Sequence, residues 1–267
     1  MIGRDPKLPP SIINLTVPLV LHVKPLLQLT RLQRLNLDNP NILEAGDLAE
    51  IAHCLTQLTH MDVGDLHVED EAAPQVISAL AALPLKKLGV LSYGPQQPGA
   101  AAGAPSPAAV GALLGQLTGL TSLTLWAGAY AWRDVAASLA RLTDLQDLML
   151  FVHDDGDDDE DGDRPRSGVI GDAADAESFV DTLAGLEKLS HLIAYDSWFG
   201  SGDAAVDLPH PIMRLQAATQ LDFLEITFIG PKPGITKADF VALKNSLPGV
   251  NMGPGFAALD EGAAAKE

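Results

Sequence analysis

The chain has 267 residues, of which 47% are hydrophobic, so it can bury a sizeable core and is not disordered as a whole. Its formal net charge of −18 argues against nucleic acids and anionic membranes as partners, because contacts to phosphate need a basic surface. The one cysteine, Cys54, excludes a disulfide within the chain. The sequence shows neither a secretory signal nor an uncharged apolar run of about 18 residues. We therefore expect a soluble cytoplasmic protein.

One pattern of alternating leucines recurs along the chain. Its full form is leucine-x-x-leucine-x-x-leucine-x-leucine with apolar replacements, and the full copies begin at Leu29, Leu55, Leu117, Leu142 and Leu186. Weaker copies begin at Leu85, Leu221 and Leu247, and a degenerate one lies at Ile13-x-Leu15. The anchor of each copy is its first strand leucine, at positions 13, 35, 61, 88, 123, 148, 192, 224 and 250. Four of the eight spacings are 25–27 residues, which indicates stacked structural repeats.

Each copy predicts a strand followed by a helix. Residues around the anchors alternate between apolar and polar, as in a strand with one buried side, and segment 12–23 is expected to add a capping strand. The segments between strands carry apolar residues at helical spacing: Leu48, Ile51, Ala52 and Leu55, then Val76, Ile77, Leu80 and Leu83, then Val135, Leu139 and Leu142. Repetition of strand and helix predicts a parallel sheet with helices on one side.

This pattern resembles the leucine-rich-repeat family, of the ribonuclease-inhibitor-like horseshoe type, over nearly the whole chain. The resemblance implies an α/β solenoid with a short parallel sheet on its concave face and helices on its convex face. The sequence departs from the family at the asparagine or cysteine that usually follows each strand, where Pro40, Leu66 and Gly128 stand. The asparagine ladder that ties successive turns together is therefore missing or replaced.

We expect one domain, residues 1–252, with eight or nine repeats and two flexible inserts. The insert at 93–107 is rich in proline, glycine and alanine. The insert at 153–176 holds eight acidic residues between Asp154 and Asp163, and residues 253–267 are expected to form a disordered tail. Because like charges repel, the acidic run predicts a solvated loop, although loose binding of divalent cations stays open.

Candidate catalytic and metal-binding groups are few. The stretch from Asp157 to Gly162 fits the opening of an EF-hand loop, but Gly168 stands where a bidentate glutamate is required. His60 and Asp62 share a face of one strand, whereas zinc needs three or four ligands. Neighbouring helix positions such as those of His53 and Cys54 point about 100° apart, which favours core packing for Cys54. We predict no catalytic residue, no metal, no cofactor and no enzyme activity.

The outward residues of the strands form three rows across the predicted sheet. The first row, one residue before each anchor, is Arg34, His60, Lys87, Ser122, Asp147, His191 and Phe223. The second row, one residue after each anchor, is Asn36, Asp62, Gly89, Thr124, Met149, Ile193 and Glu225. The third row, three residues after each anchor, is Asp38, Gly64, Leu91, Trp126, Phe151, Tyr195 and Thr227.

The middle strands carry a contiguous apolar surface in these rows. Its predicted members are Leu91, Trp126, Phe151 and Tyr195, backed by Met149 and Ile193. An exposed apolar patch with tryptophan and tyrosine is typical of a binding site, and Asp147 and Glu225 make its surroundings acidic. We expect a protein partner with an apolar anchor and a basic flank. The alternative is that the inserts fold back and cover the patch, because both leave the chain just after it.

The predicted function is that of a non-enzymatic interaction scaffold or adaptor. The resemblance implies two alternatives: a substrate-receptor fragment of a ubiquitin ligase with an F-box, and a structural subunit of a cytoskeletal or ciliary (axonemal) assembly. The first should carry a helical F-box-like segment before the repeats, where about a dozen residues stand. A third alternative, a chaperone for basic proteins, normally has its acidic stretch as a C-terminal tail rather than as an insert.

Overall fold

Nine short strands pair in chain order to make one parallel sheet in the computed structural model. The strands are β1 (Asn14–Val17), β2 (Arg34–Leu37), β3 (His60–Val63), β4 (Lys87–Tyr93), β5 (Ser122–Ala127), β6 (Asp147–Val152), β7 (His191–Tyr195), β8 (Phe223–Thr227) and β9 (Asn251–Met252). The structure describes residues 9–17, 23–37, 45–63, 73–93, 111–112, 114–127, 132–152, 173–195, 210–227 and 237–252. Every strand therefore lies beside its neighbours in the sequence, as expected for a solenoid.

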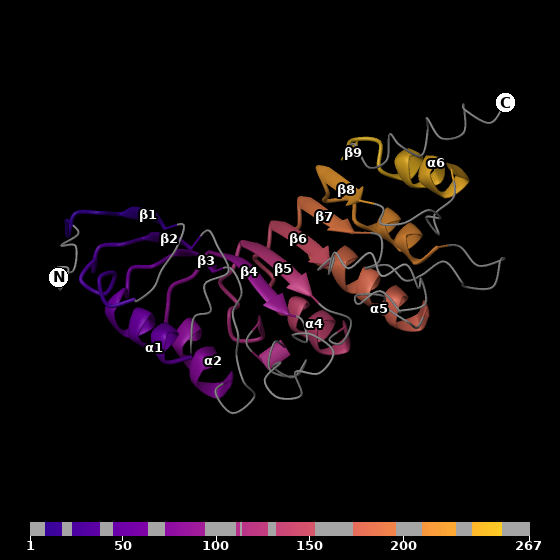
Figure 1. Ribbon diagram of the computed structural model, residues 1–267. Helices are drawn as coiled ribbons and strands as arrows, with labels where there is room; N and C mark the ends of the chain where they lie inside the picture. The colour runs from indigo at the N-terminus through magenta and orange to yellow at the C-terminus, as the bar shows by residue number, and fades with distance from the viewer. Residues whose placement is uncertain are drawn as a thin grey trace, which may run out of the picture.

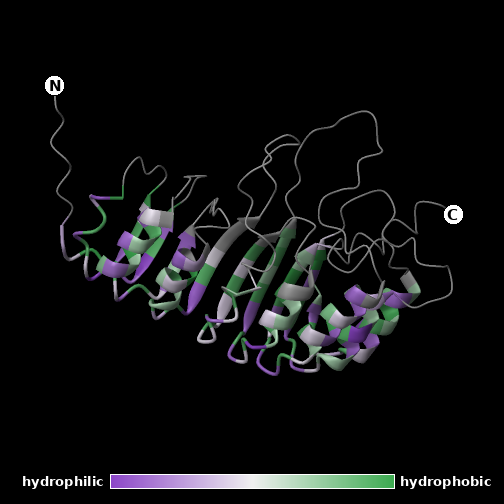
Figure 2. Ribbon diagram, turned by 90° about the horizontal axis from the view of Figure 1, so that it is seen from below, coloured by the Kyte–Doolittle hydropathy of each residue, from purple (hydrophilic) through white to green (hydrophobic). Residues whose placement is uncertain are grey.

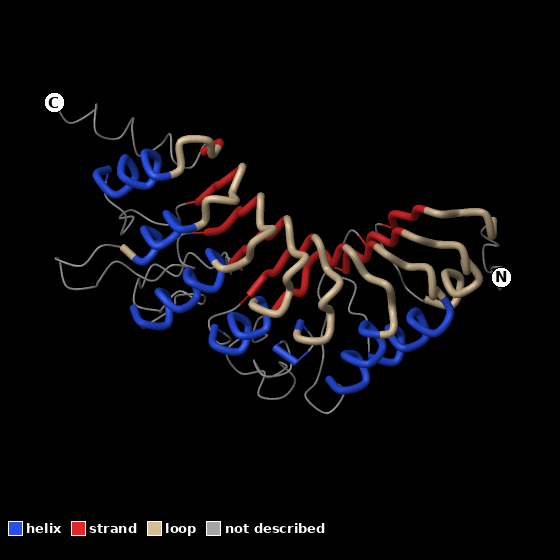
Figure 3. The backbone as a smooth tube through the Cα atoms, turned by 180° about the vertical axis from the view of Figure 1, so that it is seen from behind, coloured by secondary structure: helices blue, strands red, loops and turns tan. Residues whose placement is uncertain are grey.

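The helices lie along one side of the sheet. They are α1 (Ala45–Cys54), α2 (Ala73–Ala81), α4 (Trp132–Leu139), α5 (Ala173–Ala184), the 3₁₀ helix η2 (Pro211–Ala217) and α6 (Lys237–Ser246). Together they follow an open arc with strands on the inner side and helices on the outer side (Figure 1 and Figure 3). The predicted α/β solenoid is confirmed, with the sheet on the concave face. Among the described residues no helix is long and apolar enough to cross a membrane.

The leucines of the repeat fill one continuous core between sheet and helices. In each repeat with the full pattern, the first two leucines close a tight turn, with the amide of the second donating to the carbonyl of the first. These N···O distances are 2.8 Å for Leu32–Leu29, 3.0 Å for Leu58–Leu55, 3.0 Å for Leu120–Leu117, 2.9 Å for Leu145–Leu142 and 3.0 Å for Leu189–Leu186. A three-residue spacing turns both leucines inward, which is why the pattern recurs at this spacing.

A line of shared carbonyls joins successive turns where the strands begin. The Gln33 carbonyl accepts amide hydrogens from Thr59 and His60, at 2.9 and 3.0 Å. The same arrangement recurs at the carbonyls of Ile13, Thr59, Lys86, Thr121, Gln146 and Ser190, and the Asp222 carbonyl accepts from Asn251. Hydroxyl groups add to it, because Thr59 and Thr121 Oγ1 donate to the preceding shared carbonyl at 3.2 and 3.1 Å. These bonds tie the turns together at the strand entrances. Residues 40, 66 and 128 of the expected ladder lie outside the described residues.

The register corrects the anchors at both ends of the solenoid. Leu15 pairs with Leu35, so the first anchor is Leu15 rather than Ile13, whose side chain is 42% exposed. Met252 pairs with Leu224, so the last anchor is Met252 rather than position 250. Each error is two residues, which preserves the inward and outward sides of the strand because side chains alternate with a period of two. With the corrected anchors, the first spacing is 20 residues and the last is 28 residues.

The boundaries of the inserts also shift. Strand β4 continues to Tyr93, and α5 begins at Ala173, so residues 93 and 173–176 belong to regular elements. Ala176 is fully buried among the core residues. The rest of the second insert, with its acidic run, lies outside the described residues, as do most of the first insert and the tail.

Candidate functional site

The first row of outward residues is continuous in the structure. Arg34, His60, Lys87, Ser122, Asp147, His191 and Phe223 pair in that order across seven neighbouring strands. The second row is continuous from Thr124 through Met149 and Ile193 to Glu225. The anchor residues between these rows are buried, as the alternation predicts. The register thus places the rows on the concave face as expected; Asp38 and Gly64 lie outside the described residues.

The third row differs from the prediction at β4. An irregularity between Leu88 and Leu91 gives this strand one extra residue, so that Leu91 pairs with Leu125 and Ser92 pairs with Trp126. Leu91 therefore stands in register with Leu125, which is buried, and does not belong to the row of Trp126. The physical reason is a β-bulge, which shifts the register of the residues that follow it by one. The corrected third row is Ser92, Trp126, Phe151, Tyr195 and Thr227.

Four half-buried side chains form what we call the apolar patch: Met149, Phe151, Ile193 and Tyr195. Met149 pairs with Ile193 across β6 and β7. The rings of Phe151 and Tyr195 meet edge to face, with centroids 5.6 Å apart and planes at 64°. The backbone of Trp126 lies beside that of Phe151. Green, hydrophobic residues run along the strands of this middle part of the sheet (Figure 2). Four of the predicted site residues thus lie together on two strands.

Carboxylates border the apolar patch. Asp147 Oδ1 lies 3.2 Å from His191 Nδ1 in the first row, and both side chains are about half exposed, at 43% and 53%. Glu225 follows Ile193 in the second row. The ring of His191 also lies 6.2 Å from that of Phe223. Phe223 and His191 therefore extend the predicted site, and the candidate set omitted them because their row is otherwise polar.

The other end of the first row is positively charged. Arg34, His60 and Lys87 stand side by side on β2, β3 and β4. Partial burial, followed by the positive charges of Arg34 and Lys87, lowers the pKa of His60 below its ordinary value. The Thr59 hydroxyl lies 2.9 Å from His60 Nδ1. The concave face therefore has a basic end and an acidic end, separated by β5.

The anchors settle the fold type. In each of the nine strands one anchor pairs with the anchors of its neighbours, and the leucine turns precede the strands of the full repeats. The fold is a leucine-rich-repeat solenoid. No family model matches the sequence, and no curated protein matches it. Among solved structures, the solenoid is similar to an internalin (inlF) from Listeria monocytogenes, with 16% identity and a TM-score of 0.40. The match covers 86% of this chain and 56% of the internalin chain, so it spans little more than half of that protein.

One contact of the solenoid's concave face was not foreseen from the sequence. A Cβ atom placed on Gly89 would lie 2.6 Å from Cγ of Asp62 and 2.7 and 2.9 Å from its carboxylate oxygens. The carboxylate of Asp62 thus extends over the backbone of β4, and a larger residue at position 89 would require the Asp62 side chain to move. The glycine within a predicted strand, opposite an acidic residue in the same row, is the signal that could have indicated it.

The candidate nucleophile pair has no special arrangement in the solenoid. Cys54 is half-buried and packs against the core, as predicted, while His53 beside it is exposed. Among the described residues, no group of three or more histidine, cysteine, aspartate or glutamate side chains is placed to hold a metal ion. The acidic run between residues 154 and 163 lies outside those residues, so the solvated loop expected there stays a prediction.

Proposed function

We propose that this solenoid is a non-enzymatic protein-interaction scaffold that binds its partner on the concave face of β5–β8. The observation that carries the proposal is the apolar patch, because Met149, Phe151, Ile193 and Tyr195 are only half-buried on the sheet. An apolar surface that the core does not fully cover is typical of a site completed by another molecule.

The aromatic pair in the patch is suited to anchor a partner. Phe151 and Tyr195 are held edge to face, so part of the ordering cost of their side chains is met before binding. Tyrosine also has a hydroxyl beside an apolar ring. It therefore suits a surface that is hydrated in the free protein and buried when the partner binds. Trp126, next in the same row, is a further anchor in the proposal. Such residues at the centre of an interface are each worth about 2 kcal/mol or more.

The charges beside the patch support a partner with lysine or arginine near its apolar anchor. Asp147 and Glu225 lie on the strands that carry the patch or next to them. Complementary charges chiefly speed association and fix orientation, so binding is expected to weaken as salt is added. Affinity that is unchanged between low and high salt would contradict the basic flank but not the apolar anchor.

The test compares Phe151→Ala and Tyr195→Ala with a matched control, Val241→Ala, which removes an apolar side chain that is 44% exposed on α6. Partners captured by the wild-type chain are identified, purified and titrated against each variant by calorimetry. We expect each patch variant to weaken binding about 30-fold, the equivalent of about 2 kcal/mol, and the control to bind like wild type.

Unfolding curves of the same variants address the alternative that the chain's own inserts cover the patch. Under the proposal the patch variants lose binding with a modest loss of stability. A large fall in melting temperature together with unchanged partner binding would refute the proposal and favour coverage by the inserts.

The cytoplasmic location expected from the sequence belongs to this proposal. Co-sedimentation with microtubules would favour the cytoskeletal alternative instead.

A further inference from the structure

The basic end of the first row, Arg34, His60 and Lys87, is unusual for this chain. Arg34 and Lys87 are exposed, His60 is half-buried between them, and the three residues pair directly across β2, β3 and β4. Within the described part of the chain, no ion pair joins Arg34 or Lys87 to a carboxylate. By contrast, Lys188 and Arg214 each contact a carboxylate, at 2.5 Å to Asp144 and 3.2 Å to Glu177.

Arg34 and Lys87 flank His60 on the neighbouring strands, so a protonated His60 would stand directly opposite a like charge on each side, which is destabilising. Such an arrangement is the more unexpected in a chain with 17 lysines and arginines, 35 acidic residues and a net charge of −18. Local arrangements of residues that lower the stability of the fold occur chiefly at functional sites. The lowered pKa of His60 shows that its two neighbours are close enough to oppose its protonation, although burial contributes more.

The groups next to Arg34, His60 and Lys87 include one carboxylate and one hydroxyl. Asp62, a carboxylate of the second row, extends over Gly89 of β4. It also takes part in another interaction. The Thr59 hydroxyl beside His60 donates to the Gln33 carbonyl or contacts the imidazole, and carries no charge.

We propose that Arg34, His60 and Lys87 bind an acidic helical segment of a partner protein. The inference extends the proposed function to the other half of the concave face and does not depend on the apolar patch. Neighbouring strands lie about 4.8 Å apart, so the row spans roughly 10 Å. Along a helix, residues i, i+4 and i+7 lie on one side and span about 10.5 Å. When the helix crosses the strands, carboxylates at i and i+7 face Arg34 and Lys87, and the carboxylate at i+4 faces His60, whose protonation it favours.

The charge of the chain favours a short acidic segment over a nucleic acid. A polyanion that reached beyond Arg34 and Lys87 would meet the acidic remainder of the molecule, including Asp147 and Glu225 on the same face. A helix with three carboxylates engages only the basic end. An acidic peptide is therefore expected to bind more tightly than an oligonucleotide of similar length.

The test uses two fluorescein-labelled, alanine-based helical peptides of identical composition. One carries glutamates at i, i+4 and i+7, and the other carries the same three glutamates spread around the helix. Fluorescence anisotropy is measured with wild type, with Arg34→Gln/Lys87→Gln, and with Lys24→Gln/Arg31→Gln, which removes the same charge from two exposed residues before β2.

We expect wild type to bind the one-sided peptide at least about 5-fold more tightly than its isomer at low salt. The Arg34→Gln/Lys87→Gln variant should lose that preference, while Lys24→Gln/Arg31→Gln keeps it within 2-fold of wild type. The Phe151→Ala/Tyr195→Ala variant should bind the peptide normally, so failure of the proposed function and failure of this inference are distinguishable. Equal binding of both isomers, equal loss in both charge variants, or tighter binding of a single-stranded oligonucleotide would overturn the inference.

A second measurement locates the peptide. The imidazole of His60 is titrated by NMR with and without the one-sided peptide, with circular dichroism confirming that each variant is folded. The facing charges are Arg34, Lys87 and Asp62. Bound carboxylates should raise the pKa of His60, and removal of the two cations should raise it in the free protein. A pKa of His60 that the peptide leaves unchanged would place the binding elsewhere and refute the assignment.

Discussion

Replacing Gly89 by alanine tests the close approach of the Asp62 carboxylate to β4. The added Cβ would lie 2.6 Å from Asp62 Cγ, well inside van der Waals contact, so the aspartate side chain or the strand must move. Overpacking of this kind costs about 1–3 kcal/mol, whereas alanine in a strand recovers about 0.5–1 kcal/mol of backbone entropy relative to glycine. The two ranges together give a net change between about zero and a loss of about 2.5 kcal/mol in the free energy of unfolding.

A double-mutant cycle isolates the clash from other effects of the substitution. Urea unfolding followed by far-ultraviolet circular dichroism is measured for wild type, Gly89→Ala, Asp62→Ala and the double variant. Without the carboxylate, Gly89→Ala should stabilise the chain by about 0.5–1 kcal/mol, which gives a coupling free energy of about 1–3 kcal/mol. If Gly89→Ala lowers stability equally in both backgrounds, the contact with Asp62 is not the cause and the reasoning is wrong.

Three further predictions concern the core, one helix end and one surface cluster. Leu148→Ala, at a fully buried anchor, should cost about 2–5 kcal/mol in urea unfolding, while Val241→Ala on the surface should cost less than about 0.5 kcal/mol. The ring of His210 accepts a hydrogen bond from the Ile212 amide at 3.2 Å. Burial lowers the pKa of His210, although the negative charge of Asp239 on α6 acts in the opposite direction. The unfolded state therefore binds more protons just below about pH 6.5, so stability should fall on acidification through this range, and His210→Asn should flatten the fall. Arg214→Gln should leave the midpoint of urea unfolding nearly unchanged, with any small difference vanishing in high salt, because Arg214 and its partners are exposed.

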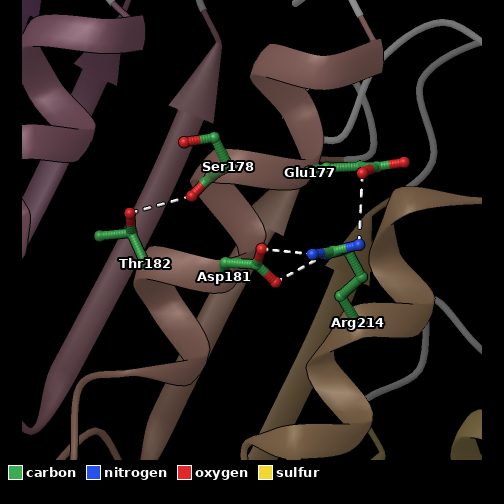
Figure 4. Close-up of polar contacts among 5 residues, drawn as sticks. All are labelled: Glu177, Ser178, Asp181, Thr182 and Arg214. Atoms are coloured by element: carbon green, nitrogen blue, oxygen red, sulfur yellow. Dashed lines mark hydrogen bonds and ion pairs between the residues drawn. The ribbon is translucent and has the colours of Figure 1, made fainter.

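That last prediction concerns the ion pairs that join α5 to η2. Arg214 Nε and Nη2 donate to the two oxygens of Asp181 at 2.6 and 2.5 Å, and Nη1 donates to Glu177 at 3.2 Å (Figure 4). These contacts hold the pKa of the Asp181 carboxyl below its usual value, chiefly through the hydrogen bond from Arg214. A clear fall in the unfolding midpoint of Arg214→Gln that persists in high salt would show that the pair is a structural requirement rather than a surface contact.

The inner repeats could be predicted from the sequence because only one register of each strand turns its leucines toward the core. Leu123, Leu148 and Leu192 each follow a leucine turn and precede another inward residue, and all three pair as anchors in the structure. A shift of one residue there would expose every leucine of the strand, which is too costly to compete with the observed register.

The errors lie where the sequence permits two choices. The stretch from Leu88 to Leu91 has apolar side chains at 88, 90 and 91, so its pattern suits a regular strand as well as the bulged one that forms. At the first strand, Ile13 and Leu15 are both apolar and two residues apart, and the pattern alone does not decide which one is the anchor. The contact between Asp62 and Gly89 depends on a side-chain rotamer, which no periodicity reveals.

The shared carbonyls at the strand entrances have a mechanical consequence. Among the described residues, these backbone bonds join each turn to the turn before and the turn after it, from Ile13 to Asn251, so a load on the two ends acts on these bonds in series. A solenoid of this kind yields at its weakest junction rather than all at once, and the short β8–β9 junction has only two paired residues on each strand. When the chain is stretched, the last turn should therefore detach first and leave the concave surface of the middle strands intact.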